Sequence, residues 1–229
     1  MDVGEGIVAR ERLFQLGHMQ MLDLTGTPAE SLDYNLLKRA FDIVFSTVVL
    51  IIAAPAFALI MIAIRCTSTG PVFFSQKRLG LNGKLFPMLK FRTMKVCDGT
   101  ESDTHWTTED DEGRTRLGTL LRKTSLDELP QFINVLKGGM SLVGPRPERP
   151  HFVQEFLNDI TRYNNRHWLK AGITGWAQVN GWRGDTSIQK RLEYDLYYLQ
   201  NWSFFFRPWH HCVNNSFRNG WPQSVLPPF

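Results

Sequence analysis

The sequence predicts an α+β protein that a single apolar helix attaches to a membrane from one side, a monotopic arrangement. Three observations carry this prediction. The run Ile43–Ile64 has no charged side chain, two apolar runs within residues 70–94 meet at an Asn-Gly turn, and the segments after residue 115 read mainly as helices. The chain then divides into a poorly ordered lead-in (1–35), a membrane helix (36–66), a domain large enough for catalysis (67–206) and an atypical tail (207–229).

The apolar run is long enough to cross a bilayer, because at about 1.5 Å per residue a straight helix of its length would cover about 33 Å. Pro55 removes a backbone donor and clashes with the preceding turn, so we expect the helix to bend or break there. Lys38 and Arg39 precede the run and Arg65 follows it, and positive charge at both ends favours a re-entrant segment. A single transmembrane span with a tolerated proline stays open as the alternative.

The composition sets further limits on function. The net charge of +4 and the pI near 9.0 suit an anionic membrane surface or phosphate-bearing substrates. The three cysteines have no paired spacing, which favours a reducing cytoplasm over a disulfide framework. Neither nucleic-acid binding nor a zinc site is expected, because the basic residues lack an aromatic interleave and the histidines lack ligand spacing.

The later elements follow from local patterns. An Asn82-Gly83 turn between apolar runs is a hairpin signal, and the acidic residues 97–115 predict a solvated connection. Residues 116–139 predict a short helix, a break near Thr124-Ser125 and a second helix ending at Gly138. The remaining expectations are an extended turn (140–150), a helix (150–168), a glycine-rich loop with two tryptophans (171–184) and an amphipathic helix (186–200).

Asp127 and Glu128 are the candidate catalytic residues. Pro130 is tolerated only in the first turn of a helix, so the two acids are expected at the N-terminal end of the second helix. A purely structural role competes here, because Ser125 and Glu128 have the spacing of a capping box and the helix dipole favours acids. The functional interpretation is that the same helix end, with its free backbone N–H groups, receives a phosphate.

Basic residues near the two acids favour phosphate chemistry. Arg122 lies one turn upstream, and Arg146 lies in a proline-stiffened loop that can aim its guanidinium with little loss of entropy. Lys90 and the other basic residues of the hairpin line a diphosphate site or face anionic lipid. A carboxylate among such cations can attack phosphorus while its neighbour holds Mg²⁺. No P-loop, G-x-G-x-x-G or G-x-S-x-G motif is present, which argues against common nucleotide hydrolysis and serine esterase routes.

The chain resembles the bacterial sugar transferase family, the monotopic polyprenyl-phosphate phosphoglycosyl transferases. The resemblance covers residues 37–203 and lies in the stretches "KRAFDIVFS", "GPVFFSQKRLGLNGK", "LKFRTM", "LRKTSLDELPQFINVLKGGMSLVGPRP", and "GITGWAQVNGWRG" through "YDLYYLQNWS". It implies that the helix is re-entrant and broken at Pro55, with a mainly helical catalytic domain on the cytoplasmic face of the bacterial inner membrane. It also implies roles for five residues: Asp127 takes the phosphosugar covalently, Glu128 binds Mg²⁺, and Lys90, Arg122 and Arg146 bind phosphate or assist catalysis.

The reaction that this resemblance implies is transfer of hexose-1-phosphate from a UDP-sugar to undecaprenyl phosphate, which begins exopolysaccharide, capsule or O-antigen synthesis. The "NGWRG" form is similar to that of members that use UDP-glucose or UDP-galactose. A homodimer is compatible with the resemblance. Family members often carry serine before the helix-breaking proline, whereas this chain has Ala54.

After Phe206 the chain departs from the family pattern. Residues 207–229 contain four prolines and lack the aspartate and the aliphatic helix expected there. Our hypothesis is that a shifted reading frame or a junction produced this ending, which the encoding DNA would test. Two alternatives to a transferase therefore stay open: a catalytically inactive, membrane-anchored scaffold or remnant, and a membrane phosphatase with the same aspartyl-phosphate chemistry.

Overall fold

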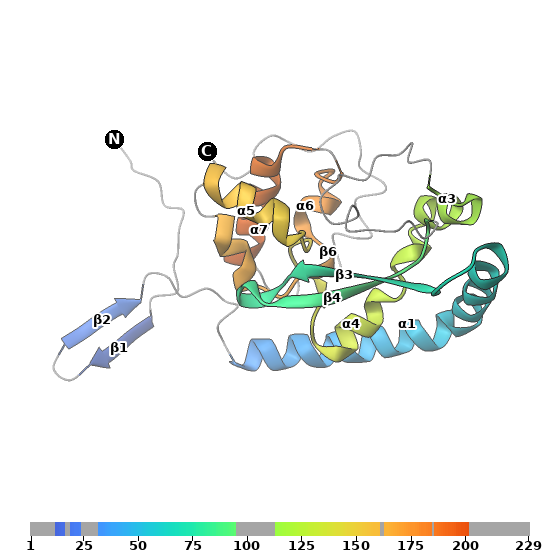
Figure 1. Cartoon of the computed structure of the whole chain (residues 1–229). Helices are drawn as coiled ribbons and strands as arrows, with labels where there is room; N and C mark the ends of the chain where they lie inside the picture. The colour runs from blue at the N-terminus through green and yellow to red at the C-terminus, as the bar shows by residue number, and fades with distance from the viewer. Residues whose placement is uncertain are drawn as a thin grey trace, which may run out of the picture.

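A 36-residue helix runs along one side of a mixed domain of helices and strands (Figure 1). The computed structural model describes residues 12–16, 19–23, 32–94, 113–160, 163–184 and 186–201. The helices are α1 (Leu32–Thr67), α3 (Arg116–Lys123), α4 (Gln131–Lys137), α5 (Pro150–Asp159), α6 (Trp176–Val179) and α7 (Ile188–Asn201). The strands are β1 (Arg12–Leu16), β2 (Met19–Asp23), β3 (Phe73–Leu79), β4 (Leu85–Phe91), β5 (Ser141–Val143) and β6 (Gly172–Thr174). Most of the predicted acidic loop and the whole tail of residues 207–229 lie outside the described residues.

The strands form three two-stranded sheets. β3 and β4 pair antiparallel across the 3-10 turn η2 (Leu81–Gly83), where Asn82 (φ 53°) and Gly83 (φ 69°) adopt the left-handed conformation that these two residue types tolerate. β5 and β6 pair parallel, although the sequence predicts a turn and a loop there. Each of these two strands has three residues, too few for an alternating pattern. β1 and β2 pair antiparallel within the lead-in of residues 1–35, for which no strand is predicted.

The first half of α1 docks on the domain through polar groups. Asp42 is 2% exposed and accepts hydrogen bonds from the Ser141 hydroxyl (2.7 Å) and the Leu142 backbone N–H (3.3 Å) at the start of β5. Lys38 donates to the carbonyl oxygen of Val143 at 3.1 Å. Arg39 donates to the last carbonyl groups of α4, including that of Leu136 at 2.7 Å. These bonds add side-chain partners to backbone groups at the end of α4 and along β5.

The second half of α1 docks through apolar contacts instead. Ile60 and Ile64 are buried against Phe91 of β4 and Leu121 of α3, and the Phe57 ring lies 4.7 Å from the Phe91 ring. Pro55 lies between the two halves, and the helix is continuous through it, so the proline does not break the helix. Figure 1 shows that the second half of α1 nevertheless turns away from the line of the first half, as expected for a proline within a helix.

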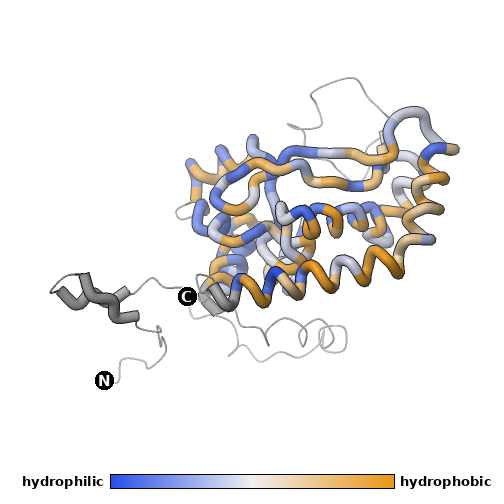
Figure 2. Tube along the Cα trace, turned by 90° about the horizontal axis from the view of Figure 1, so that it is seen from below, coloured by the Kyte–Doolittle hydropathy of each residue, from blue (hydrophilic) through white to orange (hydrophobic). Residues whose placement is uncertain are grey.

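The outer face of α1 is apolar and exposed. This helix alone among the described residues is long and apolar enough to cross a membrane, and little of its apolar stretch is buried by the rest of the described chain. Figure 2 shows the hydrophobic residues along this helix. The large side chains that remain exposed are Leu36, Leu37, Phe41, Ile43, Val44, Phe45, Val48, Ile51, Ile52, Leu59 and Ile62. Such a continuous apolar surface marks an interaction site rather than an ordinary water-facing helix.

The docking of α1 predicts a specific loss of stability. Replacing Asp42 with alanine leaves the Ser141 hydroxyl and the Leu142 N–H buried without their acceptor, so we expect Asp42→Ala to lower the free energy of unfolding by about 1–3 kcal/mol. Thermal unfolding in detergent measures the effect. The matched control is Thr47→Ala, because the exposed Thr47 hydroxyl bonds only to its own helix, at the Ile43 carbonyl. Equal losses in the two variants would contradict the docking role of Asp42.

Candidate active site

The two predicted catalytic acids lie in a short turn, not in a capped helix. Asp127 and Glu128 belong to the 3-10 turn η3 (Leu126–Glu128) between α3 and α4. Ser125 has a left-handed backbone (φ 57°) and its side chain makes no capping hydrogen bond, so the capping-box interpretation is wrong. The left-handed residue redirects the chain between α3 and η3 at the predicted break. The acids lie just before the N-terminal end of the second helix and not within it, because α4 begins at Gln131 with Pro130 as its N-cap.

Lys90 reaches both acids from β4. The buried Asn134 side chain of α4 holds this strand: it accepts from the Leu89 N–H at 2.8 Å and donates to the Pro87 carbonyl at 2.6 Å. The amide thereby satisfies two backbone groups on the free edge of β4. Lys90 Nζ lies 2.8 Å from Glu128 Oε1 and 3.7 Å from Asp127 Oδ2. An ammonium group therefore bridges the two neighbouring carboxylates.

Arg146 contacts Glu128 from a loop that follows it in the sequence, whereas Lys90 precedes it. It lies in the loop of residues 144–149 after β5, and its Nη2 donates to Glu128 Oε1 at 3.1 Å. The ion pairs of Glu128 with Lys90 and with Arg146 use the same carboxylate oxygen. One side chain of η3 thus joins two cations that are far apart in sequence.

Arg122 approaches Asp127 from α3. The backbone of α3 lies directly on the chain after β4: a Cβ atom on Gly118 would stand 2.0 Å from the carbonyl oxygen of Thr93. This close approach lets Arg122 Nε donate to the Thr93 hydroxyl at 3.0 Å. The charge of Arg122 also favours the ionised form of Asp127. The structure therefore brings together all five residues that the sequence singles out.

The two adjacent carboxyl groups have opposite pKa shifts. Asp127 is 6% exposed, and its burial raises its pKa above the ordinary 3.8, although Lys90 and Arg122 act in the other direction. Burial would also raise the pKa of Glu128, but Arg146 and Lys90 outweigh it and lower that pKa to about 2. Glu128 is therefore a fixed anion, whereas Asp127 is the more basic carboxylate of the two.

Sequence reasoning missed the charged residues behind Arg146. Arg166 and Asp195 form a buried ion pair at 2.8 Å, and Arg191 pairs with Glu148 at 3.1 Å. One signal was available in the sequence: Asp195 lies among the apolar residues of α7, between Leu192 and Leu199, where an acid requires a buried partner. No local pattern indicated which arginine supplies that partner.

The carboxylates of Asp127 and Glu128 fit one kind of metal site. No group of three or more His, Cys, Asp or Glu side chains within the described ranges is placed to hold a metal ion. Mg²⁺, however, takes one or two carboxylates and completes its coordination with substrate phosphates and water. The donor set of η3 therefore fits Mg²⁺ that arrives with a phosphate-bearing substrate, and does not fit a resident zinc site.

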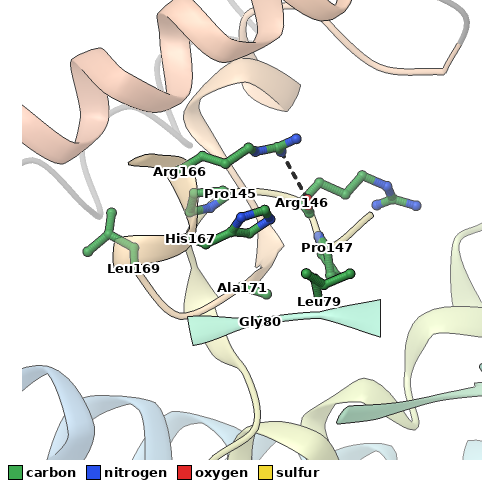
Figure 3. Close-up of a pocket in the computed structure, with 9 residues that line it drawn as sticks. All are labelled: Leu79, Gly80, Pro145, Arg146, Pro147, Arg166, His167, Leu169 and Ala171. Carbon is green, nitrogen blue, oxygen red and sulfur yellow. Dashed lines mark hydrogen bonds between the residues drawn. The ribbon is translucent and has the colours of Figure 1, made fainter. Parts of the chain in front are cut away.

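The cavity beside Arg146 is too small for a substrate. Arg166, His167 and apolar residues line it (Figure 3), and its volume of about 10 Å³ has room for roughly one water molecule. Any ligand larger than a water molecule would have to bind outside this cavity.

Comparisons with known proteins place the chain among its relatives. The model of the family described as bacterial sugar transferase matches residues 33–209. A UDP-glucose:undecaprenyl-phosphate glucose-1-phosphate transferase of Escherichia coli (strain K12) is 44% identical over 209 residues, which are 90% of this chain and 45% of that protein. A protein of the same name from Caulobacter vibrioides is 39% identical over 191 residues, 81% of this chain and 71% of that protein.

A third relative acts on a different sugar by its name. It is a UDP-N-acetylgalactosamine-undecaprenyl-phosphate N-acetylgalactosaminephosphotransferase of Aeromonas hydrophila, 37% identical over 207 residues, which are 89% of this chain and 48% of that protein. The chain spans about half the length of the Escherichia coli and Aeromonas hydrophila relatives. The family model covers well over half of the chain, and the residues it matches include η3, Lys90 and Arg146. The chain therefore belongs to the bacterial sugar transferase family.

Proposed function

We propose that the chain is a phosphoglycosyl transferase that moves hexose-1-phosphate from a UDP-sugar to undecaprenyl phosphate and so begins exopolysaccharide, capsule or O-antigen synthesis. Family membership and the names of the relatives support the reaction class. The observation that carries the proposal is the η3 turn, where Lys90, Arg122 and Arg146 surround two adjacent carboxylates. UDP-glucose and UDP-galactose are the proposed donors, on the resemblance of the "NGWRG" stretch.

In the first step a carboxylate oxygen of Asp127 attacks the phosphorus that bears the sugar. A new oxygen–phosphorus bond forms to Asp127, the bond to the bridging oxygen breaks, and UMP leaves with that electron pair. In the second step a phosphate oxygen of undecaprenyl phosphate attacks the same phosphorus. The bond to Asp127 breaks, and the carboxylate is restored as the lipid diphosphate sugar forms. Phosphoryl transfer of this kind depends on positioning and charge neutralisation, which suits a site of Lys and Arg without histidine.

The opposite pKa shifts support this division of roles. A nucleophile benefits from basicity, and Asp127 has the raised pKa of the pair. Lys90 and Arg122 still favour its ionised form, and they offset its repulsion of an incoming phosphate. Glu128, whose pKa is lowered to about 2, stays ionised and holds Lys90 and Arg146 in place. Pairs of acids whose environments separate their pKa values commonly divide tasks in this way.

Glu128 would hold Mg²⁺ when the substrate brings its phosphates, and Asp127 keeps the role of nucleophile. The metal would supply positive charge to the diphosphate, in addition to that of the three basic side chains. Lys90 and Arg146 bind the remaining phosphate oxygens, and Arg122 balances the charge of Asp127.

The apolar surface of α1 supports attachment to the lipid that carries the acceptor. We propose that α1 is re-entrant at the bacterial inner membrane, with the domain on the cytoplasmic face. The bend of the helix and its exposed apolar face support this placement (Figures 1 and 2). Because both halves of α1 pack on the same domain, the helix and the site lie on one rigid support.

The nucleophile assignment is tested by Asp127→Asn. The amide is a poor nucleophile, so we expect loss of UMP release and of the covalent adduct with a UDP-sugar labelled in its sugar phosphate. Intact-protein mass spectrometry and scintillation counting after denaturation measure the adduct. UDP-glucose, UDP-galactose and UDP-N-acetylgalactosamine are compared, with and without undecaprenyl phosphate. Release of inorganic phosphate or sugar phosphate without the lipid would favour the phosphatase, and turnover by Asp127→Asn would refute the assignment.

The metal assignment predicts a dependence on divalent ions. Chelation with EDTA should lower the rate of UMP release by about 100-fold or more, and added Mg²⁺ should restore it. Glu128→Gln should raise the Mg²⁺ concentration needed for half-maximal activity, because the variant has lost one negatively charged ligand. An unchanged Mg²⁺ requirement in this variant would remove Glu128 from the metal site.

The shifted pKa of Glu128 predicts how stability depends on pH. An acid whose pKa is lower in the folded state stabilises the fold above its ordinary pKa of 4.5 and loses that contribution as the pH falls toward 2. At neutral pH this contribution is about 3 kcal/mol at most. The raised pKa of Asp127 acts in the opposite direction, and because the charge of Glu128 is one of its causes, Glu128→Gln relieves part of it and makes the difference between the two proteins smaller than this maximum.

Thermal unfolding of the wild type and Glu128→Gln between pH 2.5 and 7 measures the effect. The difference in stability between the two proteins should narrow as the pH falls from about 5 to 2.5. The control is Glu193→Gln, because Glu193 forms only a partly exposed ion pair with Lys190 on the surface of α7. A gap for Glu128→Gln that stays constant over this range contradicts the ion-pair account.

A further inference from the structure

We propose that Arg166 and Asp195 are positioning residues for Arg146. They hold the main chain of the Arg146 loop so that its guanidinium meets Glu128 and the phosphates of the substrate. The proposal rests on the proposed function, because it assigns a task in that reaction to residues outside the acid pair and its cations.

Arg166 connects the Arg146 loop to the interior of the domain. Its Nη2 donates to the carbonyl oxygen of Arg146 at 3.0 Å (Figure 3) and lies 2.8 Å from Asp195 Oδ2 of α7. Its Nη1 donates to the Tyr163 hydroxyl at 2.6 Å. The side chains of Arg166 and Asp195 are only 2% and 3% exposed, so almost none of the surface of this pair meets the solvent. One guanidinium thus fixes a loop carbonyl, a helix carboxylate and a phenol at once.

Three further carbonyl groups of the same loop are held by other elements. Pro145 O accepts from the Gly172 N–H at 2.9 Å, Pro147 O accepts from Arg78 Nη1 at 3.1 Å, and Glu148 O accepts from the Leu79 N–H at 3.1 Å. With Arg146, four consecutive carbonyl groups have partners on β6, on the 3-10 helix η4 (Tyr163–Trp168) and on β3. The prolines at 145 and 147 also restrict φ on both sides of Arg146. The main chain at Arg146 is therefore fixed, and only the side chain is not held by these contacts.

The Arg146 side chain is the exposed end of this arrangement. Figure 3 shows its guanidinium pointing away from Arg166, and the side chain is 33% exposed while it contacts Glu128. A rigid main chain with an open guanidinium suits the binding of an incoming phosphate, because little freedom is lost on binding. Arg166 and Asp195 therefore position the loop from its buried side, whereas the charge of Arg146 on the open side contacts the substrate.

Stability alone does not require a buried ion pair at this place. Apolar residues of similar volume commonly replace such pairs without loss of stability, whereas removal of one partner leaves an uncompensated buried charge. What apolar residues cannot replace is the donor that Arg166 offers to the Arg146 carbonyl. The pair can therefore be tested separately from the fold.

The experiment compares UMP release by the wild type, Asp195→Asn and the double variant Arg166→Met/Asp195→Leu. The double variant removes both charges and should keep its thermal midpoint within a few degrees of the wild type. We expect both variants to lower kcat/KM by about 10- to 100-fold, because the Arg146 guanidinium loses its fixed position. If neither variant folds, Tyr163→Phe takes their place in the comparison, because it removes only one hydroxyl group. We expect Tyr163→Phe to lower kcat/KM by about tenfold. Glu193→Gln on the same helix is the control and should keep full activity.

Coupling to Arg146 separates positioning from a general structural role. In an Arg146→Lys background, the further loss caused by Asp195→Asn should shrink to about twofold or less, because both changes act through the same guanidinium. The proposal would be overturned if the losses of kcat/KM caused by Arg146→Lys and by Asp195→Asn multiply in full. It would also be overturned if the folded Arg166→Met/Asp195→Leu variant has the kcat/KM of the wild type.

The wild type itself distinguishes failure of the proposed function from failure of the positioning proposal. If the proposed function is wrong, the wild type releases no UMP with any UDP-sugar. Hydrogen exchange of the peptide covering residues 141–152 then tests the positioning independently of activity. Faster exchange in Asp195→Asn than in Glu193→Gln supports the proposal, and equal exchange overturns it.

Discussion

The arrangement of the site depends on one carboxylate oxygen shared by two cations. Glu128 Oε1 accepts from Lys90 at 2.8 Å and from Arg146 at 3.1 Å, and it thereby joins β4, η3 and the loop after β5. Other contacts hold the backbone that carries each cation. The Asn134 side chain bonds to β4, and four carbonyl contacts hold the Arg146 loop. With Glu128 held from both sides, Asp127 keeps its place 3.7 Å from Lys90 without a close ion pair that would occupy its oxygen atoms.

The apolar helix is built into the same support. Arg39 of α1 donates to the carbonyl groups that end α4, while Ile60 and Ile64 pack against β4 and α3. These three elements are the ones that flank or carry Lys90, Arg122 and the acid pair. Packing contacts, rather than a flexible linker, therefore fix the position of the site relative to α1. The reaction proposed above, between a water-soluble nucleotide sugar and a lipid phosphate, requires such a fixed position of Asp127 relative to the apolar helix.

Local patterns in the sequence predicted much of the framework, and tertiary contacts decided the rest. The Asn82-Gly83 turn and the left-handed Gly138 that ends α4 follow from the backbone preferences of those residues, and the sequence also predicted the break near Ser125. The role of Ser125 was misjudged because capping-box spacing does not reveal whether the serine backbone is extended or left-handed. β5 and β6 were missed because strands of three residues carry no period. The partner of Asp195 was missed because a contact between distant segments leaves no local signal.

The acid pair shows why spacing alone could not assign the roles within the site. Asp127 and Glu128 share one turn and one chemistry, yet the pKa of one is raised and that of the other is lowered to about 2. Burial raises the pKa of both, so the difference comes from the cations and from the charge of Glu128, which also raises the pKa of Asp127. Arg146 and Lys90 both contact Glu128 closely, whereas Asp127 has a looser contact with Lys90 and the more distant influence of Arg122. The loop that brings Arg146 therefore decides which of two neighbouring carboxylates is the basic one, and the division of labour in the turn is a property of the fold around it.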